Sequence, residues 1–142
     1  MEIRDARGAD ADRIAGLLEE LGYPAGPDAV AARIERFEAD PASRVLVAAD
    51  GDDLLGLASL TAMPLLHEDG CWLRISALVV RGDRRRAGVG RALVAAAEVE
   101  ARARGCRVAE ITSGEGRDRE AAHRLYRRLG YREVSRRFRK EL

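Results

Sequence analysis

The sequence predicts a mixed α/β domain in which helices pack on a sheet. Three observations point to this class. Two helical patterns precede the first long strand, two apolar runs flank a turn near residue 50, and a buried strand leads through a basic loop into a further helix. No repeat or linker divides the 142 residues, so a single domain spanning residues 1–142 is expected.

Periodicity and helix breakers define the first half of the chain. After a short extended start, apolar residues recur at helical spacing up to Gly22, a residue type that favours the end of a helix. A second helix opens at Pro27 and ends before Pro41, because proline disfavours a helical conformation in the residue before it. Residues 45–49 and 54–62 are apolar runs joined by a glycine-containing turn, which predicts a hairpin.

Strands and helices alternate in the second half. Residues 71–80 predict a strand, and the apolar end of this strand suits burial on both faces at the centre of the sheet. A helical stripe runs from Gly88 to Gly105, a strand covers residues 107–113, and a last helix ends at Gly130. The predicted order is βααβββαβαβ, and the final arginine-rich strand is marked by Tyr131, Val134 and Phe138.

Charge and composition exclude several classes of protein. Lys plus Arg number 25 and Asp plus Glu number 24, so the net charge of +1 creates no field that would attract nucleic acid or a membrane surface. The N-terminal residues show no signal-peptide pattern, and no apolar run reaches the ~20 residues that span a bilayer. These features predict a cytoplasmic protein.

The two cysteines predict neither a disulfide nor a metal site. Cys71 and Cys106 stand alone, without a CxxC pair and without a histidine at ligand spacing. Free cysteine is among the residue types most often buried. We therefore expect two buried, reduced thiols.

A basic, glycine-containing loop follows the strand at residues 71–80. The first N–H groups of a helix have no partner within the helix, and the helix dipole adds partial positive charge there, so an anion such as pyrophosphate binds well. Gly88 and Gly90 leave the backbone accessible at this point, and nearby arginines add charge. The loop is too long for a dinucleotide-binding GxGxxG turn, and a P-loop is excluded because Lys140 is the only lysine.

Two motifs resemble the GNAT superfamily of N-acetyltransferases. The run Arg85-Arg86-Ala87-Gly88-Val89-Gly90 matches the family signature R/Q-x-x-G-x-G/A, with a Leu-Val-Val strand end before it. Residues 121–131 are similar to the A-x-x-x-Y-x-x-x-G-F/Y segment of the family, and Ile3-Arg4-Asp5-Ala6 also fits. The resemblance covers essentially the whole chain. It implies the GNAT acyltransferase fold, a mixed, mostly antiparallel sheet with helices on both faces and a bulged splay at its central strands.

The resemblance also implies an enzyme that transfers the acetyl group of acetyl-CoA to an amine by direct attack in a ternary complex, without a metal. An N–H of Leu78 or Val79 would stabilise the developing oxyanion. Tyr126 matches the family tyrosine that protonates the departing thiolate. The main chain of Leu78, Val79 and Val80 would bind the pantetheine, and the pyrophosphate would lie on Arg85, Arg86, Ala87, Gly88, Val89, Gly90 and Arg91.

Departures from the family pattern leave two roles open. Many relatives carry a glutamate in or near the central strand, but residues 71–80 contain no acidic residue. Many relatives also have an asparagine at the position of Arg119, so either Ser113 or Arg119 takes its place. The general base is left among Glu110, Glu68, Asp69 and water.

The two histidines give no argument for a triad or a metal site. His67 and His123 have no carboxylate or nucleophile at a suitable spacing. His123 is expected to face away from Tyr126 on their common helix.

Two other classes of function stay open at this point. A GNAT-fold module that binds coenzyme A without catalysis fits the missing glutamate, although Tyr126 argues against it. A nucleic-acid binder would use the arginines of residues 81–91 and 132–139, but the near-zero net charge and the few aromatic residues disfavour it. The acceptor is expected to be a small-molecule or protein amine, with no nucleic-acid or membrane partner. Exposed sheet edges make a homodimer reasonable.

Overall fold

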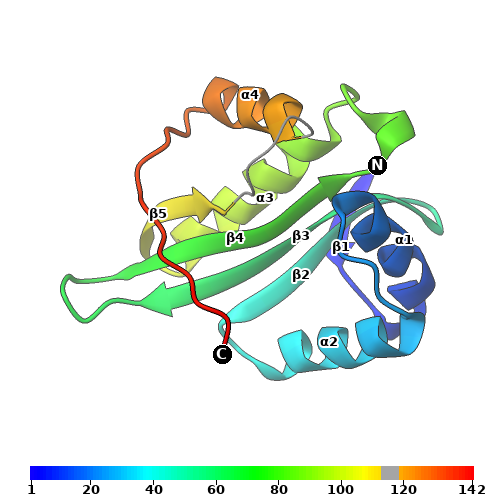
Figure 1. Cartoon of the computed structure of the whole chain (residues 1–142), viewed down its shortest axis with the longest axis horizontal. Coiled ribbons are helices and arrows are strands. Elements are labelled where there is room, and N and C mark those ends of the chain that lie inside the picture. The colour runs from blue at the N-terminus through cyan, green and yellow to red at the C-terminus, as the bar shows by residue number, and fades with distance from the viewer. Residues whose placement is uncertain (113–118) are drawn as a thin grey trace.

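The computed structural model describes residues 1–112 and 119–142, which form a five-stranded sheet with helices on both faces (Figure 1). The first four strands pair antiparallel and the fifth is parallel to the fourth, so the mixed, mostly antiparallel sheet is confirmed. The strands, in their order across the sheet, are β1 Glu2–Asp5, β2 Ser43–Asp50, β3 Asp53–Pro64, β4 Cys71–Val80 and β5 Cys106–Ile111. The helices are α1 Ala11–Leu21, α2 Pro27–Ala39, α3 Val89–Ala103 and α4 Glu120–Arg128.

Two apolar clusters hold the layers together. Helices α1 and α2 cover one face of the sheet, and α3 covers the other (Figure 1). The cluster on the α1 and α2 side includes Val30, Ile34, Val47 and Leu57. The cluster on the α3 side includes Leu60, Leu73, Ile75 and Leu93. Among the described residues, no helix is long and apolar enough to cross a bilayer.

A β-bulge interrupts β4 at Ser76. The register with β3 pairs Ala77 with Ser59 and Ile75 with Leu60, so Ser76 is an extra residue in β4. An extra residue reverses the alternation of side chains along the strand. As a result, apolar side chains on both sides of the bulge contact the α3-side cluster: Leu73, Ile75, Leu78 and Val80.

The bulge coincides with the place where β4 and β5 separate. The register between these strands covers only Cys71 to Ile75 of β4. The last contact is the N–H of Thr112, which donates to the carbonyl of Ile75 at 3.1 Å. Beyond it, residues 76–80 of β4 pair with β3 on one side, and no described residue pairs with them on the other. The predicted bulged splay is therefore confirmed, and it lies between β4 and β5.

Strand β4 lies one place from the sheet edge, so its predicted central position is wrong. The central strand is β3, which is buried from Leu54 to Leu60. β4 is only partly buried along most of its length. In the apolar run at its end, Leu78 and Val80 pack against the α3-side cluster, and Ala77 and Val79 pack on the α1 and α2 side.

The predicted final strand is also wrong. Residues 131–142 form neither helix nor strand, and residues 132–142 are all exposed. A strand needs a neighbouring strand to satisfy its backbone groups. Val134 and Phe138 alternate as in a strand, but within the described residues no second strand lies beside them.

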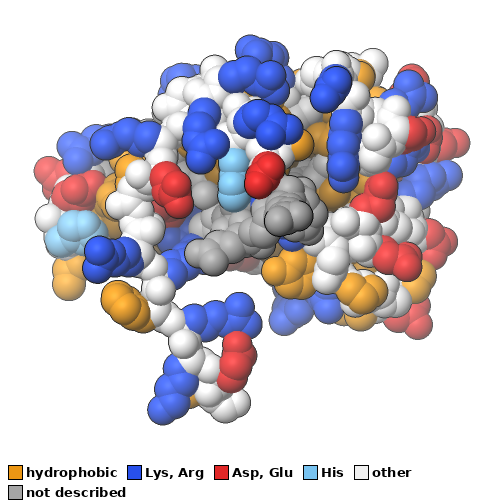
Figure 2. Space-filling model, turned by 45° about the horizontal axis from the view of Figure 1, so that its top comes forward, with side chains coloured by type: hydrophobic (Ala, Val, Ile, Leu, Met, Phe, Trp, Pro, Cys, Tyr) orange, Lys and Arg blue, Asp and Glu red, His pale blue; other side chains and the backbone are white. Residues whose placement is uncertain are grey.

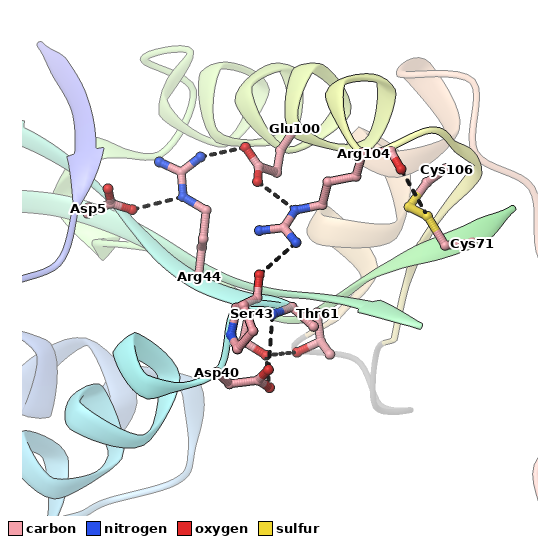
Figure 3. A network of polar contacts seen from close by, with 11 residues as sticks. Asp5, Asp40, Ser43, Arg44, Thr61, Cys71, Glu100, Arg104 and Cys106 are labelled. Atoms are coloured by element: carbon pink, nitrogen blue, oxygen red, sulfur yellow. Dashed lines mark hydrogen bonds and ion pairs between the residues drawn. A yellow bond between two sulfur atoms is a disulfide. The ribbon is translucent and has the colours of Figure 1, made fainter. Parts of the chain in front are cut away.

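A disulfide joins Cys71 and Cys106 at the first residues of β4 and β5, so the expectation of reduced thiols is wrong (Figure 3). The parallel register places these residues opposite each other, with their Cα atoms 4.4 Å apart. Next to the disulfide, Glu100 of α3 accepts hydrogen bonds from Arg44 and Arg104, which ties β2 to α3 (Figure 3). The cysteines meet because β4 and β5 are neighbours in the sheet. Their separation of 35 residues in the sequence gives no sign of this.

Candidate active site

The loop between β4 and α3 has a constrained backbone. It contains one turn of 3-10 helix, Gly82–Arg84, and then reaches α3 through two residues with positive φ. These are Arg86, at φ +67°, and Gly88, at φ +81°. Positive φ is uncommon for residues other than glycine, and such strained positions cluster at ligand sites. The conformation of Arg86 therefore points to a loop shaped for a ligand.

Side chains from three elements hold the start of this loop in place. The guanidinium of Arg81 pairs with Asp53 at the beginning of β3 and with Asp83 in the loop, at 2.7 and 2.6 Å. These carboxylates raise the pKa of Arg81 further above its usual range. Glu20 of α1 accepts a hydrogen bond from the N–H of Gly82 at 3.0 Å. The guanidinium of Arg81 is thus occupied by ion pairs within the protein.

The start of α3 presents free backbone N–H groups. Gly88 is the N-cap, and the first helical hydrogen bond runs from the N–H of Ala92 to its carbonyl at 3.0 Å. The N–H groups of Val89, Gly90 and Arg91 precede that bond and find no acceptor in the described part of the chain. Together with the helix dipole, they form a site suited to a phosphate.

The two signature glycines have different surroundings. A Cβ at Gly88 would meet no atom within 4 Å, so the backbone there is open to a ligand. A Cβ at Gly90 would lie 2.9 Å from Leu125 of α4 and 3.5 Å from Val80. Gly90 therefore leaves room for the tip of the Leu125 side chain where α4 approaches the start of α3, a reason that the sequence motif did not indicate.

The arginines of the loop divide into two groups. Arg81 forms the ion pairs described above, whereas Arg85, Arg86 and Arg91 are exposed and form no ion pair with another described residue. Their guanidinium groups are available for charge-assisted hydrogen bonds to an anion at the helix start.

The open side of β4 exposes the main chain of alternate residues. The N–H of Arg81 donates to the carbonyl of Leu55 at 2.8 Å, toward β3. Backbone groups alternate in direction along a strand, so those of Val79 also point to β3, and those of Leu78 and Val80 point into the splay. Of the three predicted main-chain partners, Val79 thus faces away from the splay, and its side chain is buried on the α1 and α2 side.

Tyr126 lies on α4, largely withdrawn from solvent. Burial raises the pKa of its phenol above the usual value, and the nearby positive charge of Arg119 opposes that rise. The phenol therefore keeps its proton at neutral and moderately alkaline pH. The ring of His123 lies 6.1 Å from that of Tyr126, between centroids, so the expectation that His123 faces away is wrong. Residues three apart on a helix are neighbours.

Arg119 connects α4 to the opposite layer of the protein. Its guanidinium donates to the carbonyl of Leu21, the last residue of α1, at 2.9 Å. This contact and the effect on the pKa of Tyr126 place Arg119 between the end of α1 and the phenol. Ser113, the other predicted substitute for the family asparagine, lies outside the described residues.

Two of the three carboxylates considered as general base form ion pairs. Glu110 of β5 pairs with Arg74 at 2.6 Å. Glu68 accepts a hydrogen bond from the indole of Trp72 at 2.9 Å and lies 3.4 Å from the guanidinium of Arg107. The indole hydrogen bond, followed by that charge, lowers the pKa of Glu68. Asp69 is exposed in the loop before β4.

The structure brings out one polar residue that the sequence analysis missed. Ser76, the bulge residue of β4, is exposed, and its hydroxyl lies 2.7 Å from that of the buried Ser59. It marks the point where the splay opens. A single serine within an otherwise apolar strand end was the available signal.

Comparisons with known proteins decide the family. The sequence model of the acetyltransferase (GNAT) family matches residues 12–131. The chain belongs to the GNAT family. This GNAT chain is 33% identical to an aminoalkylphosphonate N-acetyltransferase of Salmonella typhimurium, over 99% of its own length and 91% of that protein.

Solved structures share the fold at lower identity. A transcriptional regulator from Bacillus halodurans superposes with a TM-score of 0.88 at 21% identity, over 99% of both chains. The aminoglycoside N-acetyltransferase AAC(6')-Iy, solved in complex with CoA, gives a TM-score of 0.83 at 19% identity, over 99% of this chain and 93% of that one.

The GNAT chain is an N-acetyltransferase that transfers the acetyl group of acetyl-CoA to an amine. The family match and the curated relative favour this interpretation over a non-catalytic module or a nucleic-acid binder. The open cradle at Gly88 and the free N–H groups beside it suit the pyrophosphate of such a cosubstrate.

Proposed function

We propose that this enzyme binds acetyl-CoA along the open side of β4 and on the loop that follows it. The main chain of Leu78 and Val80 binds the pantetheine, while Val79 contributes to the core. The main support is the order of the elements. Residues 76–80 of β4 have no partner on the β5 side, and the loop that follows them ends at the free N–H groups at the start of α3. The pyrophosphate is held by Arg85, Arg86, Ala87, Gly88, Val89, Gly90 and Arg91.

Acetyl transfer follows from the groups around the splay. Bound acetyl-CoA supplies an acetyl group activated as a thioester. The amine attacks its carbonyl carbon directly in a ternary complex, so a C–N bond forms as the C–S bond breaks. The N–H of Leu78 donates to the carbonyl oxygen, where negative charge develops. Tyr126 gives its phenolic proton to the departing thiolate, and its raised pKa keeps that proton in place beforehand.

The amine must also lose a proton, since alkyl amines have a pKa near ~10.4. We assign this role to water, because Glu68 and Glu110 are both held by arginines and Asp69 precedes the end of β4 that lies away from the splay. Ser76 is exposed where the splay opens, and its hydroxyl, which bonds that of Ser59, has a further bonding position for such a water.

The acceptor we propose is a small primary amine that carries an anionic group. Support comes from the aminoalkylphosphonate N-acetyltransferase, which matches almost the full chain. Acetylation rates are expected to be at least about ten-fold higher for an aminoalkylphosphonate than for the alkylamine of equal length, because a charge-assisted hydrogen bond contributes roughly 1.5–3 kcal/mol. A coupled thiol-release assay measures both. Equal rates, or a preference for aminoglycosides or peptide amines, would contradict this acceptor class.

Binding of the cosubstrate is tested separately from the chemistry. The double variant Arg85→Glu/Arg86→Glu is expected to weaken acetyl-CoA binding by roughly 10- to 100-fold, since two charge-assisted contacts are replaced by repulsion. Calorimetric titration measures the Kd, with ATP and NAD as comparison ligands. Arg136→Glu/Arg137→Glu, the same change of charge at exposed positions outside the loop, is the matched control. An unchanged Kd in the loop variant would remove these arginines from the site.

We also propose that residues 1–142 act as one catalytic unit in the cytoplasm and pair as a homodimer. The match of 99% of the chain to one curated relative supports the single unit, and the open edge of the sheet supports pairing. Disulfides are rare in reducing compartments, so in the cytoplasm the bond between Cys71 and Cys106 is expected to be reduced. Its redox state in the cell is the observation that decides the location.

A further inference from the structure

The helices α1 and α2 cover only part of their face of the sheet. On strands β2, β3 and β4, the last members of the apolar cluster on this side are Val45, Leu57 and Ala77. Two positions further along the same face the residues are serines, Ser43 on β2 and Ser59 on β3. The hydroxyl of Ser59 bonds that of Ser76, so the change from apolar to polar side chains occurs where the splay opens.

A row of polar side chains crosses this uncovered part of the face. The register places Ser43 of β2 opposite Thr61 of β3, and their hydroxyl oxygens lie 3.0 Å apart (Figure 3). Thr61 is opposite Arg74 of β4, and Arg74 is opposite Glu110 of β5. The sequence neighbours of Thr61 and Arg74 pack on the α3 side, so the row faces the other way. All four of its members are partly buried, and partly buried polar groups on a sheet face indicate a site for a polar ligand.

Arg74 is the cation of this row, and it is held from one side only. Its Nε donates to a carboxylate oxygen of Glu110 at 2.7 Å, and its Nη2 lies 2.6 Å from the same oxygen. A guanidinium has five N–H donors, and the Nη1 of Arg74 forms no hydrogen bond with another described residue. Arg81, by contrast, is shared between two carboxylates. Arg74 therefore presents oriented donors to an anion.

Other arginines lack this preparation. Figure 2 shows basic side chains spread over the side of the molecule that carries α4. Arg124, Arg127 and Arg128 of that helix are exposed. An exposed, unfixed side chain loses rotamer freedom when it binds, and water weakens its charge. The side chain of Arg74 is 36% exposed and is fixed by Glu110, so an anion gains more there.

We propose that Arg74 binds the anionic group of the acceptor and thereby determines which amines are acetylated. This inference rests on the acetyl transfer proposed above. Successive strand residues rise by about 3.3 Å, so Arg74 and Ser76 lie roughly 7 Å apart along β4. An acceptor with its amine at Ser76, beside the thioester, reaches Arg74 with its phosphonate through a short carbon chain. Glu110 is a positioning residue, which orients the guanidinium and offsets part of its charge.

The variant Arg74→Gln tests this role with two acceptors of equal length. For aminoethylphosphonate, kcat/KM is expected to fall by about ten-fold, the lower end for a charge-assisted contact, because Glu110 already offsets part of the charge. For propylamine, which has no anionic group, kcat/KM should stay unchanged, as should the Kd for acetyl-CoA. Arg44→Gln, which removes a paired arginine from the α3 side of the sheet, is the matched control and should change neither rate. Thermal unfolding checks the fold of both variants.

Glu110→Gln provides a second measurement with the opposite sign. The amide keeps an oxygen that accepts from Arg74, but the negative charge next to the guanidinium is lost. The KM for aminoethylphosphonate is therefore expected to fall by a few-fold, and the KM for propylamine should stay the same. An unchanged or raised KM for aminoethylphosphonate would overturn the assignment of Arg74.

Failure of the acceptor class and failure of this inference give different results. If the natural enzyme acetylates aminoethylphosphonate and propylamine equally well, the proposed acceptor class is wrong, and the role of Arg74 is overturned with it. If the natural enzyme prefers aminoethylphosphonate and Arg74→Gln keeps that preference, the acceptor class stands and Arg74 is excluded as its binding residue. Arg119→Gln in the same assay then shows whether the arginine near the phenol of Tyr126 binds the anion instead.

Discussion

Replacement of Tyr126 by phenylalanine is expected to lower kcat by roughly 100-fold, the usual contribution of a positioned general acid. The substitution removes only the hydroxyl, so the packing of α4 and the Kd for acetyl-CoA should stay nearly unchanged. The matched control is Tyr131→Phe, which loses a hydrogen bond to Glu98 and leaves the splay untouched. Steady-state kinetics on both variants make the comparison. Full activity of Tyr126→Phe would exclude the phenol from the chemistry.

The pH dependence separates an acid from a packing residue at the same position. Burial raises the pKa of Tyr126, so the proton is present below the usual tyrosine value of about 10 and is lost only at higher pH. The rate of the natural enzyme is therefore expected to rise with pH as more of the amine becomes neutral, and to fall where the phenol ionises, above about pH 10. In Tyr126→Phe that descending limb should be absent. If the rate of Tyr126→Phe still falls at high pH, a group other than Tyr126 is responsible for that fall.

Removal of the disulfide by Cys71→Ser/Cys106→Ser is expected to lower the free energy of unfolding by roughly 4 kcal/mol, from the entropy of closing a loop of this length. The bond closes a separation of 35 residues that includes most of β4 and all of α3. Urea unfolding of the natural chain with and without a reductant, beside the double variant, measures the loss. Reductant should lower the stability of the natural chain and leave the variant unchanged.

Counting thiols gives an independent check on the bond. In denatured, unreduced protein no thiol should react, because Cys71 and Cys106 are the only cysteines in the sequence. Two reactive thiols would show that the cysteines are reduced in the protein as isolated, and the stability difference should then vanish.

Local signals in the sequence predicted the helices and most strands. The helix α2 begins at Pro27 and ends before Pro41, because proline acts on the backbone of its own residue and of the one before it. Gly22 ends α1 with a φ of +96° for a similarly local reason. Such effects need no knowledge of the rest of the fold, and for that reason these boundaries could be predicted.

Features that depend on a distant partner could not be predicted from local signals; the bulged splay was expected only from the resemblance to the GNAT family, which did not place it at Ser76. The bulge at Ser76 exists only relative to β3, and the bond between the cysteines exists only because β4 and β5 become neighbours. The final strand was predicted from alternation alone, which gives the side of each residue but says nothing about a neighbour. A segment with the residues of a strand becomes one only if a neighbouring strand pairs with it, and residues 131–142 have no such neighbour among the described residues.

The basic loop lies between a strand and a helix as predicted, but the sequence does not show what each of its residues contacts. Arg81, before the motif, and Arg85, at its start, have the same side chain, and only the positions of Asp53 and Asp83 show that Arg81 forms ion pairs within the protein. The same holds for Gly90, whose neighbour Leu125 comes from a helix that is distant in the sequence. The motif thus predicted a loop between a strand and a helix, and the tertiary contacts show which of its residues are bound within the protein.

Because of the bulge at Ser76, deletion of this residue would change β4 far more than its substitution. Ser76 is exposed, so there is room for other side chains, but its hydroxyl bonds that of the buried Ser59 at 2.7 Å, and a residue that cannot make this bond leaves Ser59 without it. Deletion of the residue would instead turn every later position of the strand by half a turn, bringing Val79 toward α3 and sending Leu78 and Val80 to the opposite face. For an engineer who wishes to reshape the splay, position 76 can be varied among residues that still hydrogen-bond Ser59, whereas the number of residues between Ile75 and Ala77 is fixed.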